Sequence, residues 1–263
     1  MKKIVLVVLL IGIMAVVLAG CSGSATPYSA WADEEVLEYK ITNNLTGENV
    51  GTMTMTTVRN PSDKTLDGKE YASADGKVVI DLIKDGVCSV HTELLTLRYS
   101  VLATHKEYTD LADASKSYVL KAYHSGKNYF YSFNDGEEKK LKVGASGYAD
   151  SEYIYHYIRC YTLSSPPSSV KVPDPLNDTV LTVSCSAYAN WSFDVPYPTG
   201  TKNANCTVVA ISLSSAPKGK PILAAFTPEG DAMSELSQRD SMKMPAQIVE
   251  NDLTYTVTSM HAN

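Results

Sequence analysis

The residues with the clearest chemistry lie near the start of the chain, at Leu18-Ala19-Gly20-Cys21. A basic start, Met1-Lys2-Lys3, precedes an uncharged apolar run from Ile4 to Val17, and small residues then lead into the cysteine. This order is typical of a bacterial lipoprotein signal, because the apolar run is too short to span a membrane and ends at a cleavage pattern. We therefore expect Cys21 to become the first residue of the mature protein and to carry diacylglyceryl and acyl groups.

This N-terminal pattern predicts a lipid-anchored protein that faces the extracytoplasmic side of the cell membrane or the outer membrane. Acyl chains hold a protein on a membrane through buried methylene groups, about 0.8 kcal/mol each, so a multiply acylated cysteine is a durable anchor. An uncleaved N-terminal anchor helix is the alternative, and it leaves the rest of the chain on the same side. Ser22 follows the cysteine, where an aspartate would favour retention in an inner membrane.

The sequence carries no recognisable catalytic or metal-binding motif. Gly144-Ala145-Ser146-Gly147 lacks the glycine spacing of a nucleophile elbow, and the five histidines are scattered without a His-Glu-x-x-His pattern. Cys160 and His156 would lie one helical turn apart as a nucleophilic dyad, but nothing else supports it. An envelope hydrolase would need a serine, a histidine and an acid brought together by folding. We predict a non-enzymatic protein with no metal and no cofactor.

Four further cysteines follow the first one: Cys88, Cys160, Cys185 and Cys206. Their wide spacing disfavours a zinc knuckle or a thioredoxin-type site. Disulfides, which an oxidising compartment permits, and small buried thiols are equally open interpretations. The net charge of −6 disfavours nucleic acid as a partner.

Composition divides the chain into three regions. We expect a signal peptide over residues 1–20 and a lipidated flexible tether over 21–34, which begins with small polar residues. Residues 35–263 are long enough for a single β-rich domain.

Alternation of apolar and polar residues predicts mostly strands. Val36–Thr42 and Val50–Val58 form the first expected hairpin, and the dipeptides Asp75-Gly76 and Asp85-Gly86 are strong hairpin signals. Further strands are expected at Lys77–Ile83, Val87–Leu97, Tyr118–His124, Asn128–Phe133, Lys139–Val143, Thr179–Ala187, Cys206–Leu213, Ile222–Phe226 and Leu253–Met260.

A helix is favoured over Asp150–Leu163, where apolar residues recur at helical spacing and Pro166-Pro167 follows. Asp150 or Ser151 would cap it. A strand remains an alternative, because the tyrosines in this segment also alternate. Ala232–Lys243 is a candidate for one further short helix.

Several short motifs resemble those of the DUF3108-like envelope proteins. Val36–Lys40 with Val50–Met53 is similar to the opening hairpin of that family, and Asp150–Arg159 to its central helix. Thr199–Val209 and Met244–Ile248 are similar to two of its later strands. Two segments depart from the pattern: the irregular Thr104–Ser117 and the insertion Trp191–Pro198.

The resemblance implies a curved antiparallel sheet, or half-barrel, wrapped around one central helix, similar to lipoprotein carriers of the LolA and LolB type. Such half-barrels often bind hydrophobic molecules, so it implies a cavity for a lipid or another apolar ligand. The 17 tyrosines suit the wall of such a cavity, although they also suit an ordinary sheet. From periodicity, the expected lining residues are Met53, Met55, Tyr153, Ile154, Tyr157, Ile158 and Tyr161.

The alternative is a structural lipoprotein with a filled core, no small-molecule ligand and an envelope protein as its partner. It predicts a close-packed interior and an exposed apolar patch.

Overall fold

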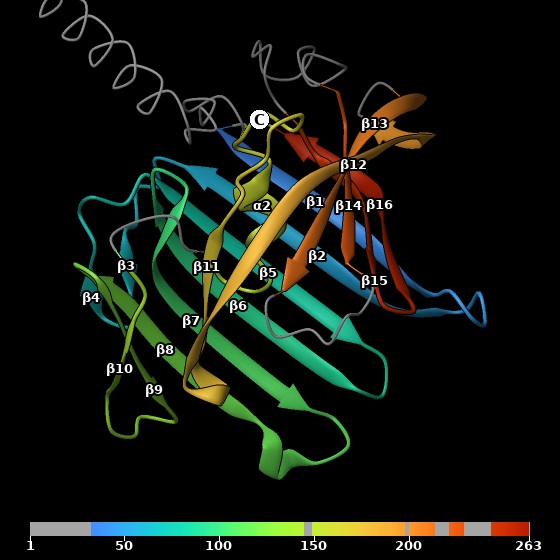
Figure 1. Ribbon diagram of the computed structural model, residues 1–263. Coiled ribbons are helices and arrows are strands. Elements are labelled where there is room, and N and C mark those ends of the chain that lie inside the picture. Colours follow the sequence, from blue (N-terminus) through green and yellow to red (C-terminus); the bar gives the residue numbers. More distant parts are fainter. Residues whose placement is uncertain (1–32, 145–148, 198–199, 214–220, 229–242, 263) are drawn as a thin grey trace, which may run out of the picture.

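The computed structural model describes residues 33–144, 149–197, 200–213, 221–228 and 243–262. Within these ranges, 14 strands form one antiparallel sheet that curls nearly into a closed barrel (Figure 1). The prediction of a mainly β fold is therefore confirmed. The strands of this sheet are β1 (Glu34–Asn43), β2 (Asn49–Arg59), β5 (Gly76–Lys84), β6 (Cys88–Leu97), β7 (Ser100–Asp110), β8 (Tyr118–Ser125), β9 (Asn128–Phe133), β10 (Lys139–Lys142), β11 (Val170–Asp174), β12 (Thr179–Tyr197), β13 (Gly200–Leu213), β14 (Ile222–Phe226), β15 (Pro245–Glu250) and β16 (Leu253–Ala262).

The strand order explains how the barrel nearly closes. It runs β10-β9-β8-β7-β6-β5-β2-β1-β16-β15-β14-β13-β12-β11, so that β1 lies between its hairpin partner β2 and the last strand, β16. The two edge strands of the sheet, β10 and β11, leave a seam between them. Across this seam, the Tyr131 hydroxyl donates a hydrogen bond to Asp178 Oδ1 at 2.7 Å.

Most of the predicted hairpins are present. The pairs β1–β2, β5–β6 and β8–β9 are antiparallel neighbours in the expected segments. Asp75-Gly76 does not make a hairpin turn between sheet neighbours, because β5 pairs with β2 across an intervening loop. That loop holds the small hairpin of β3 (Thr65–Leu66) and β4 (Lys69–Glu70).

The two segments that depart from the family pattern contain strands. The first half of Thr104–Ser117 belongs to β7, and Trp191–Tyr197 continues β12, which pairs with β13 from Val183 to Tyr197. Pairing with β6 and β8 stabilises β7, and pairing with β13 stabilises this part of β12, although local alternation did not predict either strand.

The segment predicted as a helix over Asp150–Leu163 is helical only at α2 (Ile154–Ile158). Its N-cap is Tyr153, without a side-chain hydrogen bond, so the predicted capping by Asp150 or Ser151 is wrong. These polar side chains bind a buried lysine instead, as described below. The helix candidate Ala232–Lys243 lies almost wholly outside the described residues.

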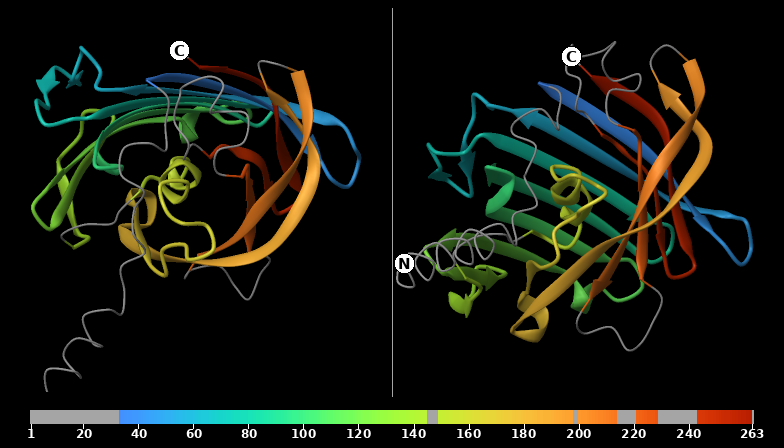
Figure 2. Two further views of the ribbon diagram at one scale, coloured as in Figure 1. Left: turned by 90° about the horizontal axis from the view of Figure 1, so that it is seen from above. Right: turned by 45° about the horizontal axis from the view of Figure 1, so that its top comes forward.

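All five residues of α2 are buried, and α2 lies on the inner side of the curved sheet (Figure 2). The sheet contributes every second side chain to this interior, as the burial pattern of β1 and β5 shows. Burial of apolar area at about 25 cal/mol per Å² is the main favourable contribution to such a core. Two short 3-10 helices, η1 (Ala114–Lys116) and η2 (Pro175–Asn177), lie in connections between strands.

One end of the barrel is formed by tight turns, and we call it the turn end. Backbone hydrogen bonds join these turns: Asn44 N to Asp252 O at 2.7 Å, Asp85 N to Val50 O at 2.9 Å and Leu111 N to Val87 O at 3.0 Å. β1 begins near Glu35 at the opposite end, which we call the Glu35 end.

Gly51 provides a test of the close approach between β2 and β5. A Cβ atom there would lie 2.0 Å from the backbone oxygen of Ile83, whereas a Cβ at Gly47 would meet nothing within 4 Å. We expect G51A to lower the free energy of unfolding by about 3 kcal/mol, because backbone cannot move aside as a flexible side chain does.

The matched control is G47A, which has a positive φ but open space. It should cost only about 1 kcal/mol, from backbone strain alone. Urea denaturation of both variants measures the difference, and equal costs would contradict this account of Gly51.

Candidate functional site

Two buried charge clusters hold the segment from Ala149 to Leu163. The first lies at the Glu35 end, where Arg159 makes two hydrogen bonds to Glu35: Nη1 to Oε1 at 2.6 Å and Nη2 to Oε2 at 2.9 Å. Both side chains are fully buried. A bidentate arginine–carboxylate pair has both energy and fixed geometry, so it sets the position of α2 against β1.

His156 extends this first cluster. Its Nε2 lies 2.6 Å from the Thr57 hydroxyl on β2 and 4.0 Å from Glu35 Oε1. Burial and the nearby Arg159 guanidinium hold the pKa of His156 well below its ordinary value, so the ring is neutral. The Glu35–Arg159 pair therefore balances its own charge. Because the cluster is closed to solvent, it is a structural element of the core.

The second cluster lies toward the turn end and centres on Lys106 of β7. Its ammonium donates to Glu152 Oε2 at 2.5 Å, to Asp150 Oδ1 at 3.1 Å and to the Ser151 hydroxyl at 3.3 Å. Only 7 % of the Lys106 side chain is exposed. An ammonium has three N–H groups, so these contacts use its whole donor capacity.

The carboxylates of this cluster differ in their environment. Burial raises the pKa of Asp150 to about 7, against the opposing effect of Lys106. Burial alone would also raise the pKa of Glu152, but the Lys106 ammonium, together with hydrogen bonds from Asp150 and Ser151, outweighs burial and lowers that pKa. Two carboxylates thus share one ammonium, which is costly in a low-dielectric site unless a further positive charge or a proton is present.

Two cavities flank this cluster at the turn end. The larger has a volume of about 300 Å³ and the smaller about 160 Å³, and Ser151 and Glu152 line both. The walls of the larger cavity come from β7, β8 and β9 on one side of the seam and from β11, η2 and β12 on the other. Its lining is Lys106, Tyr118, Leu120, Phe133, Asp150, Ser151, Glu152, Val172, Pro173, Asp174, Pro175, Leu176 and Leu181.

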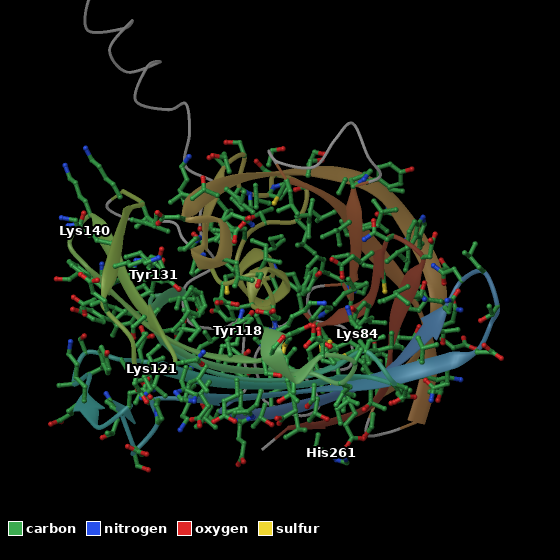
Figure 3. All side chains as sticks on the ribbon, turned by 90° about the horizontal axis from the view of Figure 1, so that it is seen from below. Lys84, Tyr118, Lys121, Tyr131, Lys140 and His261 are labelled. Atoms are coloured by element: carbon green, nitrogen blue, oxygen red, sulfur yellow. The ribbon has the colours of Figure 1, made fainter. Side chains whose placement is uncertain are left out.

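The smaller cavity lies on the other side of the Asp150–Glu152 loop. It is lined by Met53, Leu82, Lys84, Ser151, Glu152, Tyr155, Glu250 and Tyr255. In Figure 3, Lys84 and Tyr118 lie on the inner side of the sheet, one from each cavity, whereas Lys121 and His261 lie on its outer side.

The structure brings most of the sequence-predicted lining residues into one packed core. Met53 lines the smaller cavity. Tyr161 is half-buried, and its hydroxyl lies 2.6 Å from that of Tyr157. The others line neither of the two cavities and have exposed fractions between 0 and 4 %: Met55, Tyr153, Ile154, Tyr157 and Ile158.

Sequence reasoning missed Lys106, Tyr155, Glu250 and Tyr255. Lys106 lies in a strand that the sequence did not predict, so the alternation of apolar and polar residues did not indicate that its side chain points inward. Asp150 and Ser151 were expected only as caps of the predicted helix. Cys21, the predicted lipidation site, lies outside the described residues.

The structure decides between the two interpretations of the later cysteines. Cys88, Cys160, Cys185 and Cys206 are all buried free thiols. Burial raises the pKa of Cys185 to about 12. Cys160 Sγ donates to the backbone oxygen of His156 at 3.4 Å, and not to its ring, so the two do not form a nucleophilic dyad.

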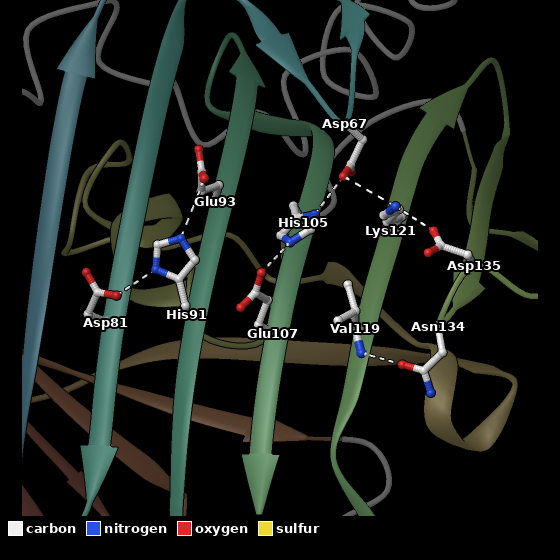
Figure 4. Close-up of polar contacts among 10 residues, drawn as sticks. All are labelled: Asp67, Asp81, His91, Glu93, His105, Glu107, Val119, Lys121, Asn134 and Asp135. Atoms are coloured by element: carbon white, nitrogen blue, oxygen red, sulfur yellow. Dashed lines mark hydrogen bonds and ion pairs between the residues drawn. The ribbon is translucent and has the colours of Figure 1, made fainter.

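The outer face of the sheet carries a separate polar network (Figure 4). His91 lies between two carboxylates, with its Nδ1 at 2.6 Å from Asp81 Oδ1 and its Nε2 at 3.5 Å from Glu93 Oε1. His105 also lies between two carboxylates, with its Nδ1 at 2.7 Å from Asp67 Oδ1 and its Nε2 at 3.2 Å from Glu107 Oε1. Among the described residues, no group of histidine, cysteine and acidic side chains has an arrangement that could hold a metal ion.

None of the helices in the described ranges has the length and apolar character that a membrane crossing requires.

Comparison with known proteins supports the fold and little more. No family model matches the chain, and no curated protein matches it. Among solved structures, the chain is similar to the crystal structure of a β-barrel-like protein of a domain of unknown function, DUF1849, from Brucella abortus.

The match to that structure has a TM-score of 0.51 and 8 % sequence identity, and it covers 88 % of this chain and 98 % of the other. Identity this low shows a shared barrel-like fold alone. The DUF3108-like resemblance rests on its short motifs and stays a prediction.

Replacing Lys106 tests the second cluster. K106M would leave two carboxylates without their ammonium, and we expect a loss of about 3–5 kcal/mol in the free energy of unfolding at pH 8. The loss should shrink at pH 5. Without Lys106 the pKa values of Asp150 and Glu152 rise above their unfolded values, so the folded variant binds more protons as the pH falls and gains stability.

The matched control is K121M on the outer face, where Lys121 pairs with the largely exposed Asp135. That exposed pair should contribute only about 0–1 kcal/mol. Urea unfolding of the wild type, K106M and K121M at pH 8 and pH 5 measures these free energies. A cost for K106M that equals that of K121M, or that does not depend on pH, would contradict the assignment.

Proposed function

We propose that this protein is a non-enzymatic cell-envelope lipoprotein whose barrel binds an apolar or amphipathic ligand at its turn end. The observation that carries the proposal is the pair of cavities on the two sides of the Asp150–Glu152 loop. In this view α2 is a central plug that packs at the Glu35 end of the barrel, and the two cavities lie at the turn end.

The larger cavity has the properties of a small-molecule site. Its volume of about 300 Å³ lies at the lower limit for ligand pockets, which combine apolar walls with a few well-placed polar groups. Leu120, Val172 and Leu181 supply apolar wall, and Lys106 with its carboxylates forms the polar end. Each Å² of apolar ligand surface removed from water there would contribute roughly 25 cal/mol.

The tether and the cavities lie at opposite ends of the barrel, which suits a binding protein that is anchored to a membrane. The tether joins the barrel at the start of β1, near Glu34, and the β1–β2 turn is at the far end of that strand. The cavities therefore open at the end of the barrel that is remote from the point where the tether joins it. This placement would leave the binding site accessible when Cys21 is held in a membrane.

A second candidate is the interaction lipoprotein, and one observation favours it. Loops at the turn end expose large apolar side chains: Leu45 is 77 % exposed, Leu176 64 % and Val87 56 %. A partner protein that docks at the turn end would bury them.

Native mass spectrometry tests the ligand proposal. The full-length protein, extracted from its membranes and released from detergent micelles in the gas phase, should carry a stoichiometric extra mass. L181W should lose it, because Leu181 is half-buried in the wall of the larger cavity and the indole would fill that space.

L97W is the control, since Leu97 is exposed and lines neither cavity. A protein that stays free of added mass after incubation with membrane lipids would contradict the proposal and favour the interaction candidate. Equal ligand retention by L181W would show that the ligand binds elsewhere.

Lipidation is tested at Cys21. Cells supplied with radiolabelled palmitate should label the wild-type protein, and C21S should lose the label because the serine hydroxyl cannot form the thioether. C88S is the matched control, since Cys88 is a buried thiol that should carry no lipid. Label that persists in C21S would contradict the anchor.

A further inference from the structure

The turn-end cavities have an excess of negative charge in their lining. The charged side chains that line them are four acids, Asp150, Glu152, Asp174 and Glu250, and two lysines, Lys84 and Lys106. A concave site lined mostly by one sign of charge attracts the opposite sign, because its low-dielectric walls concentrate the electric field.

Both lysines already have acidic or aromatic neighbours within the chain. The Lys106 ammonium already donates to Asp150, Ser151 and Glu152, which uses its donor capacity. The Lys84 ammonium lies 5.8 Å from the centre of the Tyr255 ring, and Glu250 and Tyr255 both favour its charged form. At Lys106, a ligand carboxylate or phosphate would have to displace an existing partner and would face Asp150 and Glu152.

The larger cavity also has aromatic walls. Tyr118 stacks on Tyr108 with ring centres 5.1 Å apart. It also makes an edge-to-face contact with Phe133, whose ring centre lies 5.4 Å from its own. These contacts fix the orientation of two rings that line the cavity. Aromatic faces attract organic cations, and the attraction strengthens where the cation is desolvated.

We propose that the turn-end cavities select an organic cation, an ammonium group joined to a short apolar body, over the neutral and the anionic molecule with the same body. The cation would lie beside Glu152 and Asp150 and supply the positive charge that two carboxylates around one lysine lack. The apolar body would pack against Leu120, Val172 and Leu181. This inference rests on the proposed function and names the chemical class of its ligand.

The cavity and the charge have separate roles in this account. The apolar and aromatic walls provide the space and the binding energy for the body of the ligand. The carboxylates decide which head group is accepted, because a buried charge is tolerated only when it is paired.

Three probes with one eight-carbon tail test the charge selection: octylamine, octanol and octanoate. Isothermal titration of the full-length protein at pH 8 keeps octylamine cationic and octanoate anionic. We expect octylamine to bind about tenfold more tightly than octanol, and octanoate to bind most weakly.

Two variants locate the selecting charge. E152Q should reduce the octylamine affinity about tenfold and leave the octanol affinity nearly unchanged. D174N removes a second lining carboxylate without touching Lys106, so it provides the same test if E152Q does not fold. E107Q is the control, since Glu107 belongs to the outer-face network.

Each outcome supports or overturns the inference. Equal affinities for octylamine and octanol, or the tightest binding by octanoate, would overturn the charge selection and leave the ligand-binding function standing. Tight octylamine binding that neither E152Q nor D174N weakens would also overturn it. Failure of all three probes, together with a native protein free of ligand, would remove both the function and the inference.

Discussion

The fully buried ion pair between Arg159 and Glu35 is the interaction on which the interior of this barrel depends. Glu35 lies at the start of β1, which pairs with both β2 and β16 and so joins the two halves of the sheet. Arg159 directly follows α2. Loss of one partner would leave a buried charge uncompensated, which typically costs several kcal/mol, so the pair fixes where α2 lies against the sheet.

The second buried cluster gives the interior its asymmetry. Lys106 reaches across from β7 and holds the loop that precedes α2, so the segment is bound at both of its ends. Between the two clusters the side chains of α2 pack into the core. The larger cavity lies between the loop and the seam, and the smaller one lies on the other side of the loop. Cavities therefore occur next to a rigid, charged loop, which is a favourable place for recognition of a polar head group.

The sequence predicted the local parts of this arrangement better than the long-range ones. Hairpins such as β1–β2 and β5–β6 were predictable because alternation and a short turn are encoded in neighbouring residues. β7 was missed, since its inward positions include Thr104 and Lys106, whose burial depends on partners far along the chain. The helix was predicted too long because Asp150 and Ser151 are good N-cap residues, whereas their contacts with Lys106 determine their position. The cavities could not be predicted, because each is lined by strands far apart in the chain: the larger by β8, β9 and β12 across the seam, and the smaller by β2, β5, β15 and β16.

Residue-resolved hydrogen exchange tests the central claim, that the helical segment is fixed inside the barrel, most directly. The amides of Tyr157, Arg159, Cys160 and Tyr161 donate within this segment. The account predicts that they exchange only through global unfolding, with the same free energy as the innermost amides of β1 and β2. Exchange of these four amides at a free energy well below that of the sheet would show a segment that opens independently, and it would contradict the account.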